Sequence, residues 1–384
     1  MTGMSVALIV GTPKGAAILT SKDRDRWDMS FELRGWPVTA SARDDKGRAY
    51  IAVNSPNYGV ALHTSDDFKT WKQLETAPRY KPEDRGNPEH HRLVAKEDFG
   101  GLLKGGGRFV DQIWNLHSAH GALYAGVSEA GLFVSRDRGA SWQPIDGFNE
   151  HPSRHNWVPG FGGLGAHTVL SDAKNPNRMW VGISAAGLFR TDDGGKTWSA
   201  KNLGVDPSTK EDVANTGPTT GQCVHSVTHD PNSANIMFRQ EHRGVHRSDD
   251  GGDTWRVIED GLPVGELSDG HRCSFGFASA MDHKSGQVYL VPLQSDNFRF
   301  PPDGQLAVYR TRNGKTWEKL TKGLPGNCFT AVLRGAMSAD QTDQGGLYFG
   351  TASGAVYASQ DRGENWREIA SGLPRIMSVD AYAT

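Results

Sequence analysis

The chain has 384 residues and a formal net charge of −2, so no strong overall field selects nucleic acid or an anionic membrane as partner. Its 47 glycines suit a turn-rich all-β protein, and its three cysteines, an odd number, argue against a disulfide framework. No apolar run approaches the roughly 20 residues of a membrane span. The first residues also lack a basic region followed by a long apolar core. We therefore expect a cytoplasmic protein with neither nucleic-acid nor membrane partners.

A short turn motif with the spelling Ser/Thr-x-Asp-x-Gly-x-Ser/Thr/Asn-Trp recurs along the chain. The copies, the looser ones included, lie at 21–27, 64–71, 135–142, 191–198, 248–255, 311–317 and 359–366. Asp and Gly between two apolar runs predict a tight turn, in which Gly supplies positive φ and the Asp carboxylate accepts backbone N–H groups. The Trp can pack beneath this turn. We interpret every copy as a folding turn, and the missing twelve-residue ligand spacing excludes a calcium loop.

Each motif follows two short runs of alternating apolar residues joined by a small-residue turn, which is the pattern of a β-hairpin. In chain order these hairpins are expected at 6–21, 49–65, 122–135, 178–191, 235–248, 287–311 and 346–359. A leading strand is expected before every hairpin except the first, at 38–43, 113–119, 166–171, 224–229, 275–281 and 330–337. A short strand after each Trp completes four antiparallel strands per repeat.

The two ends of the chain complement each other. The first repeat lacks a leading strand, whereas the apolar run at 376–382 is left over after the last repeat. A C-terminal strand that completes the first repeat would close a ring and remove its exposed edges. We therefore predict an all-β fold in which residues 1–384 form one domain, a seven-bladed β-propeller of four-stranded antiparallel blades.

The motifs resemble the Asp-box, or BNR, repeats of sialidases, xyloglucan-cleaving glycoside hydrolases, sortilin-type receptors and photosystem assembly factors. The resemblance covers essentially the whole chain and implies the propeller fold, but it joins hydrolases to non-catalytic binding proteins. Sialidases carry an Arg-Ile-Pro motif near the N-terminus. The most similar sequence here, Arg375-Ile376-Met377, lies near the C-terminus instead, so sialidase activity is not expected. The chain looks closest to bacterial proteins described as glycosyl-hydrolase-like.

Long insertions are expected on the face of the ring opposite the motif turns. They fall at 76–112, 143–163, 199–222, 256–273 and 292–305. Loops longer than about 12–15 residues in a compact domain are often functional. Among their aromatic residues we expect Trp157 and Phe161 to stack on a substrate ring.

Three leading strands share a histidine followed by Ser or Thr, which places His117, His167 and His225 in one pattern. His167 and His225 also stand five residues before an Asp. Because equivalent positions on adjacent inner strands lie close together, we expect these three imidazoles to converge at the channel mouth. Three neutral imidazoles with an open position describe a catalytic site for a divalent metal. The same histidines could instead act without metal as acid or base, or simply hydrogen-bond neighbouring strands.

Further polar residues are predicted to face the same opening. Gln240 and His242 lie in the hairpin turn of the fifth repeat, and Arg334 lies on the last leading strand, where it could bind an anionic group. The three cysteines each precede a leading strand and are interpreted as small buried residues. No two carboxylates form a recognisable glycosidase pair.

Two hypotheses about function follow. In the first, the channel mouth acts on a saccharide or other polar small molecule, and His117, His167 and His225 hold a metal that polarises a substrate oxygen or activates water. Hydrolase and lyase chemistry both stay open. In the second, the protein is a non-catalytic propeller that binds a ligand or a protein partner, as the resemblance to assembly factors implies.

Overall fold

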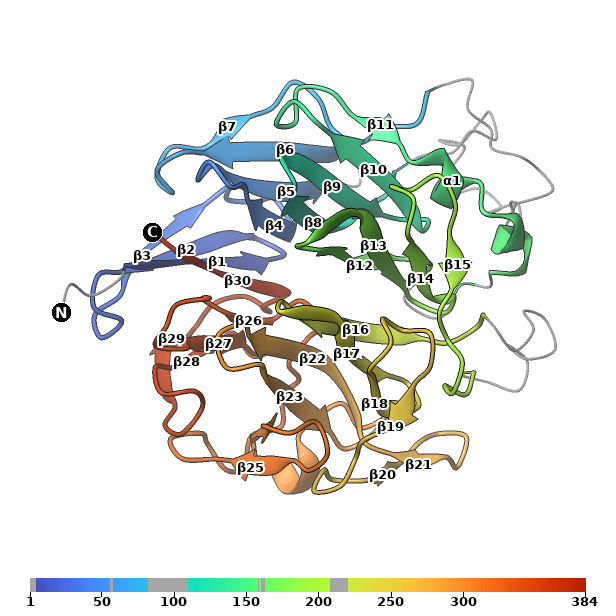
Figure 1. Cartoon of the computed structure of the whole chain (residues 1–384). Helices are drawn as coiled ribbons and strands as arrows, with labels where there is room; N and C mark the ends of the chain where they lie inside the picture. Colours follow the sequence, from blue (N-terminus) through green and yellow to red (C-terminus); the bar gives the residue numbers. More distant parts are fainter. Residues whose placement is uncertain (1–4, 56–57, 82–109, 158, 160–162, 208–219) are drawn as a thin grey trace, which may run out of the picture.

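The computed structural model describes residues 5–55, 58–81, 110–157, 159, 163–207 and 220–384. Seven four-stranded antiparallel sheets radiate from a common axis, which confirms the predicted seven-bladed β-propeller (Figure 1). Among the helices of these residues, none combines the length and the apolar character needed to cross a membrane.

The blades are numbered in chain order, and their strands run from the channel outward. Blade 1 contains β30 (Ser378–Ala383), β1 (Val6–Thr12), β2 (Gly15–Ser21) and β3 (Asp28–Glu32). Blade 2 contains β4 (Val38–Arg43), β5 (Ala49–Ser55), β6 (Gly59–Ser65) and β7 (Lys72–Gln73). Blade 3 contains β8 (Ile113–Ala119), β9 (Ala122–Val127), β10 (Gly131–Ser135) and β11 (Gln143–Pro144). Blade 4 contains β12 (Ala166–Asp172), β13 (Asn175–Ile183), β14 (Gly187–Thr191) and β15 (Ser199–Ala200).

The remaining blades continue in the same order. Blade 5 contains β16 (Val224–Asp230), β17 (Ser233–Glu241), β18 (Gly244–Ser248) and β19 (Arg256–Val257). Blade 6 contains β22 (Phe275–Asp282), β23 (Gln287–Leu293), β24 (Val308–Thr311) and β25 (Glu318–Leu320). Blade 7 contains β26 (Met337–Ala339), β27 (Leu347–Gly350), β28 (Val356–Ser359) and β29 (Arg367–Ala370). The insertions carry α1 (Asp146–Asn149), 3-10 turns at Pro152–Asn156 and Pro302–Gly304, and the short hairpin of β20 (Gly265–Glu266) with β21 (Arg272–Cys273).

The ring closes as predicted. β30 pairs antiparallel with β1, from Val6 opposite Ala383 to Gly11 opposite Ser378, and both strands lie in one sheet in Figure 1. The leading strand expected at 330–337 is the exception, because β26 begins only at Met337. Just before it, Gly335 forms a parallel bridge with Ser378 of blade 1. This contact with the neighbouring blade holds the backbone there outside its own sheet.

The Asp-box turns have the predicted internal hydrogen bonds. In blade 5 the Asp250 carboxylate accepts the Ser248 hydroxyl at 2.7 Å, the Thr254 amide at 2.9 Å and the Thr254 hydroxyl at 2.6 Å. Gly252 has φ 93°, where only glycine is unstrained, and donates its N–H to Ser248. Trp255 is 5% exposed and donates its indole N–H to Lys201 O of the preceding connection. The box therefore closes its own turn and fastens it to the adjacent blade.

Acid is expected to destabilise the fold through these turns. The pKa values of the box carboxylates of Asp23, Asp67, Asp137, Asp193, Asp250 and Asp361 all lie below the ordinary value. The pKa of Asp137 is lowered to about 2 by its hydrogen bonds, and the one donated by the Ser141 hydroxyl contributes most. A carboxylate whose pKa is lower in the folded protein stabilises the fold when the pH is above its unfolded pKa of about 3.9. This stabilisation is lost as the pH falls through the folded pKa.

Urea unfolding at a series of pH values checks this expectation. The free energy of unfolding should fall steadily as pH decreases from about pH 4 to pH 2, because the unfolded chain takes up each box proton at a higher pH than the folded protein does. Asp137→Asn should remove part of this slope. Stability that rises on acidification below pH 4 would contradict the assigned role of the boxes.

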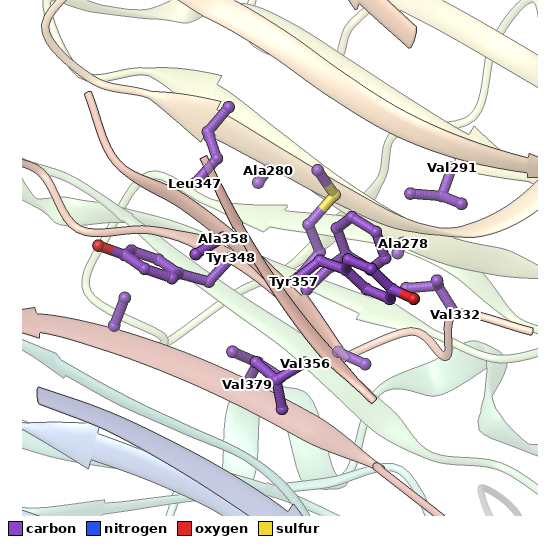
Figure 2. Packing of buried hydrophobic residues seen from close by; sticks show 14 of the residues in the cluster. Ala278, Ala280, Val291, Val332, Leu347, Tyr348, Val356, Tyr357, Ala358 and Val379 are labelled. Atoms are coloured by element: carbon purple, nitrogen blue, oxygen red, sulfur yellow. The ribbon is translucent and has the colours of Figure 1, made fainter. Parts of the chain in front are cut away.

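The core is divided into layers between neighbouring blades. Figure 2 shows one such layer, in which Ala278 and Val291 of blade 6 lie on the same side as Tyr357 of blade 7, and Val356 of blade 7 lies close to Val379 of the closing strand. Tyr348, Val356 and Val379 are fully buried. Burial of such side chains stabilises the fold by about 1.5–3 kcal/mol each. The closing strand is therefore part of the core as well as the last strand of a sheet.

Candidate functional site

The inner strands of blades 2 to 6 share a bulge near their first residues, on the face opposite the Asp-box turns. The register shifts there leave Thr39, Trp114, His167 and His225 as the extra residues of blades 2 to 5. In blade 6 a wider shift leaves Phe277 at the same place. Bulges re-aim side chains and are frequent beside active sites. These five residues therefore form one level around the channel mouth.

His117 does not belong to this level, which corrects the expected convergence of three imidazoles. It lies three residues beyond the bulge of β8, opposite Tyr124, or about 10 Å further along the strand. There its Nε2 lies 2.8 Å from the Ser171 hydroxyl. Burial, assisted by the nearby His229 and His120, lowers the pKa of His117 to about 4. The sequence already held a signal for this difference. An Asp stands five residues after His167 and after His225, but not after His117.

His167 lies at the predicted level, but both of its ring nitrogens bond within the protein. Nε2 is 2.8 Å from Val224 O of blade 5, and Nδ1 is 3.0 Å from the Thr168 hydroxyl. A carbonyl only accepts hydrogen bonds, so Nε2 carries the proton and Nδ1 accepts from Thr168. The ring is 7% exposed. These contacts favour the alternative role of a link between neighbouring strands over that of a metal ligand.

His225 is oriented differently and keeps one nitrogen available. Its Nδ1 lies 2.6 Å from Gly276 O of blade 6 and must donate, which leaves the lone pair on Nε2. The ring packs against Phe275 and Phe277, with centroid distances of 5.2 and 4.6 Å. Burial and the nearby Arg334 hold the pKa of His225 well below its usual value. His225 is therefore a neutral imidazole with an unprotonated Nε2.

Arg334 reaches this level from the segment before β26. Its guanidinium carbon lies 5.7 Å from the centre of the Phe277 ring, and burial lowers its pKa. Within the described part of the chain it makes no hydrogen bond and no ion pair with a carboxylate, and its Nε is buried without a partner. Arg299 lies 5.4 Å from the same ring but donates its Nε to Asp296 O. Arg334 is thus the guanidinium left to meet a ligand.

Gln240 is a second polar group without an internal partner. It is 1% exposed, and neither its amide oxygen nor its amide nitrogen is hydrogen-bonded to any described residue. The amide abuts Gly276, where a Cβ would come within 2.8 Å of Nε2. Ser226, its cross-strand neighbour, has an unpartnered hydroxyl as well. Leaving such groups unsatisfied costs about 1–3 kcal/mol each, so a polar ligand or water is expected there.

His242 and Cys223 complete the group. The backbone N–H of His242, in the turn between β17 and β18, donates to Cys223 O at 3.1 Å. The His242 ring centroid is 5.9 Å from that of His225, and its Nε2 is 3.7 Å from Asp296 Oδ2. Ligand atoms of Cys223, His225 and His242 all lie within 4.8 Å of one another, a spacing that could hold a metal ion. We name Cys223, His225, Gln240, His242, Phe277 and Arg334 the channel-mouth site.

The two aromatic residues expected to stack on a substrate fall elsewhere. Trp157 is 2% exposed and packs against Phe148 and Phe189 in the core between blades 3 and 4. Its ring faces are covered by protein, so the expected stacking role is corrected. Phe161 lies outside the described residues. The exposed aromatic side chains of the described residues are instead Tyr58, at 81%, Phe298, at 59%, and Phe329, at 69%.

Comparison with known proteins agrees with the propeller architecture. Residues 189–200 match the family described as BNR/Asp-box repeat. A xyloglucanase of Hypocrea jecorina is 27% identical over 296 residues, which cover 70% of this chain and 33% of that enzyme. An ancestral GH74 enzyme superposes with a TM-score of 0.56 at 16% identity, over 87% of this chain and 38% of the other. YCF48 bound to D1 peptide superposes with a TM-score of 0.47 at 13% identity, over 88% and 85%. The chain thus spans about a third of the length of the xyloglucanase.

Proposed function

We propose, from the premise that the chain is a BNR-type, glycosyl-hydrolase-like β-propeller, that its channel-mouth site binds a saccharide or similar polar small molecule with an anionic group. The observation that carries this proposal is Arg334, whose guanidinium lies 5.7 Å from the centre of the Phe277 ring and has no carboxylate partner in the described chain. A desolvated charge without a counter-ion is costly. The planar guanidinium fork matches a carboxylate, sulfate or phosphate in two parallel hydrogen bonds.

The surroundings of Arg334 support a polar ligand of sugar size. Gln240 and Ser226 offer unpartnered amide and hydroxyl groups at the same level, the type of group that fixes sugar hydroxyls. Phe298 and Phe329 are exposed and are joined through Phe300, with ring centroids 6.0 and 5.4 Å apart. Arg299, next to Phe298 in the chain, connects this aromatic group to Phe277. Exposed rings of this kind can cover the apolar face of a sugar.

Hydrolysis by two carboxylates finds no support among the described residues. Such an enzyme needs an acid and a second carboxylate about 5–9 Å apart on either side of the glycosidic bond. Glu241 is instead paired with Arg239 at 2.9 Å, and both side chains are fully buried. Asp296 accepts the N–H groups of Ser268 and Asn297. Any bond cleavage at this site would therefore depend on its imidazoles or on a metal.

Binding of acidic and neutral sugars by Arg334 variants tests the proposal. Calorimetric titration with uronic-acid oligosaccharides and their neutral counterparts should show binding of the acidic series only. Arg334→Gln should weaken that binding about 10- to 150-fold, because it removes a hydrogen-bonded charge worth about 1.5–3 kcal/mol. Arg256→Gln is the control, since Arg256 is exposed near the Asp-box face and pairs with Asp249.

The outcomes separate the two functional hypotheses. Equal binding of acidic and neutral sugars, or an unchanged affinity in Arg334→Gln, would contradict the assigned role of Arg334. If folded wild-type protein bound no sugar of either series, the non-catalytic alternative with a protein partner would take the place of this proposal.

A further inference from the structure

We infer that Cys223, His225 and His242 form a binding site for a borderline-soft divalent cation such as Zn²⁺ at the rim of the channel. One ligand atom from each residue lies within 4.8 Å of the other two. Bonds of about 2.0–2.3 Å around a tetrahedral zinc place neighbouring ligand atoms about 3.3–3.8 Å apart. The three side chains therefore need only a small inward adjustment to share one ion. Of the three histidines expected from the sequence to bind metal, only His225 belongs to this site. Cys223 and His242 take the places of His117 and His167.

The backbone holds the three ligands in place. Cys223 and His225 flank Val224, the first residue of β16, and the bulge at His225 turns its side chain to this side. His242 is carried by the two-residue turn that joins Glu241 to Gly244, whose φ of 107° suits glycine. The 3.1 Å hydrogen bond from the His242 amide to Cys223 O ties that turn to the inner strand. The cluster is thus a consequence of strand pairing within one blade.

The hydrogen bonds around the imidazoles suit metal binding. Metal-bound histidines usually donate their second ring N–H to a carbonyl or carboxylate, which fixes the tautomer and orients the ring. His225 already has this arrangement, since its Nδ1 bonds to Gly276 O at 2.6 Å and leaves Nε2 as the ligand atom. Asp296 places Oδ2 3.7 Å from Nε2 of His242, where a small ring rotation would allow it to accept that N–H.

The ligand types indicate which cation the site would take. One thiolate and two imidazoles are typical of zinc and other borderline or soft ions, whereas Mg²⁺ and Ca²⁺ require oxygen ligands. Three protein ligands leave a fourth position open, as in catalytic rather than structural zinc sites. Arg334 lies close enough to interact electrostatically with both Cys223 and His225. An anionic group held by Arg334 would therefore stand beside the open position.

Metal titration of the full chain tests the inference, which does not depend on the sugar proposal. Chelator-treated, reduced protein is titrated with Zn²⁺ in competition with a chromophoric chelator, and with Co²⁺ while the absorption spectrum is recorded. Wild type should bind one equivalent, and Co²⁺ should produce a thiolate-to-metal charge-transfer band. Cys223→Ser and His242→Asn should each weaken Zn²⁺ binding by about a hundredfold or more, and Cys223→Ser should abolish the band.

Matched variants keep the experiment decisive. Cys328→Ser removes another partly buried thiol, and His117→Gln removes the imidazole that lies further along its strand, so both should bind Zn²⁺ like wild type. Thermal unfolding of the metal-free variants checks that each is folded. Wild-type protein that gives no charge-transfer band, or that binds Zn²⁺ no more tightly than Cys223→Ser, would overturn the inference, whether or not acidic sugars bind. Loss of binding in Cys328→Ser or His117→Gln would also overturn it.

Discussion

Removing residues 378–384 should abolish cooperative folding of the propeller. These residues supply β30, which pairs with β1 along its length, and they bury Val379 between blades 7 and 1. The N–H of Val379 also donates to Gly335 O at 2.8 Å, in the parallel bridge that joins the last blade to the first. Without them β1 would present an unpaired inner edge, and two interblade layers would open to water. The expected loss is on the order of the 5–15 kcal/mol that stabilises a typical domain.

Thermal and urea unfolding of the truncated chain measure this effect. We expect an aggregation-prone protein without a cooperative transition, and partial recovery when a peptide of residues 376–384 is added in trans. Removal of Thr384 alone, an exposed residue beyond β30, is the control and should leave the transition nearly unchanged. A truncated chain that unfolds cooperatively at the wild-type midpoint would show that closure by β30 does not support the ring.

Above about pH 7, where Glu241 is ionised, Glu241→Ala should destabilise the protein by about 3–5 kcal/mol, the cost of leaving a buried charge without its partner. The Glu241 carboxylate lies 2.9 Å from Arg239, and neither side chain is exposed. Arg239 also donates to Asn202 and lies 5.7 Å from the Trp255 ring, so it cannot turn to solvent without disturbing an Asp-box. Burial raises the pKa of Glu241 to about 7. Because Glu241 precedes His242, the same change should also weaken metal binding.

A double-mutant cycle separates the pair from its surroundings. Arg239→Met combined with Glu241→Leu should recover most of the lost stability, because no charge then remains buried. Between about pH 4.5 and 7 wild-type stability should fall as pH rises, since the folded state retains the Glu241 proton that the unfolded chain has released. Glu241→Leu with Arg239→Met should remove this slope. A cost below about 1 kcal/mol for Glu241→Ala would show that the pair is not coupled.

Most of the fold can be read from the sequence because each blade repeats the same local chemistry. An Asp and a Gly before a Trp define four of the seven outer turns, looser copies of the motif mark the other three, and alternation defines the hairpin before each. The strands predicted at 38–43 and 113–119 match β4 and β8. The leading strand of blade 7 was misplaced because Gly335 bonds to another blade, a contact that carries no local signal.

The candidate site was only partly predictable, since it depends on register. Arg334, Gln240 and His242 were predicted to face one opening, and the structure groups them around Phe277 and Gly276 with His225. His117 was misplaced because a His-Ser pair occurs by chance three residues further along its strand. Cys223 was assigned to the core because its nearness to His242 results from hairpin pairing, which spacing along the chain does not reveal.

A crystal structure of the protein with a bound uronic-acid sugar tests the central claim most directly. We predict that the sugar carboxylate lies about 2.7–2.9 Å from the guanidinium nitrogens of Arg334, with a sugar hydroxyl on the Gln240 amide. Density for the sugar on the Asp-box face or between outer strands, with Arg334 still unpartnered, would contradict the assignment of the channel mouth as the functional site.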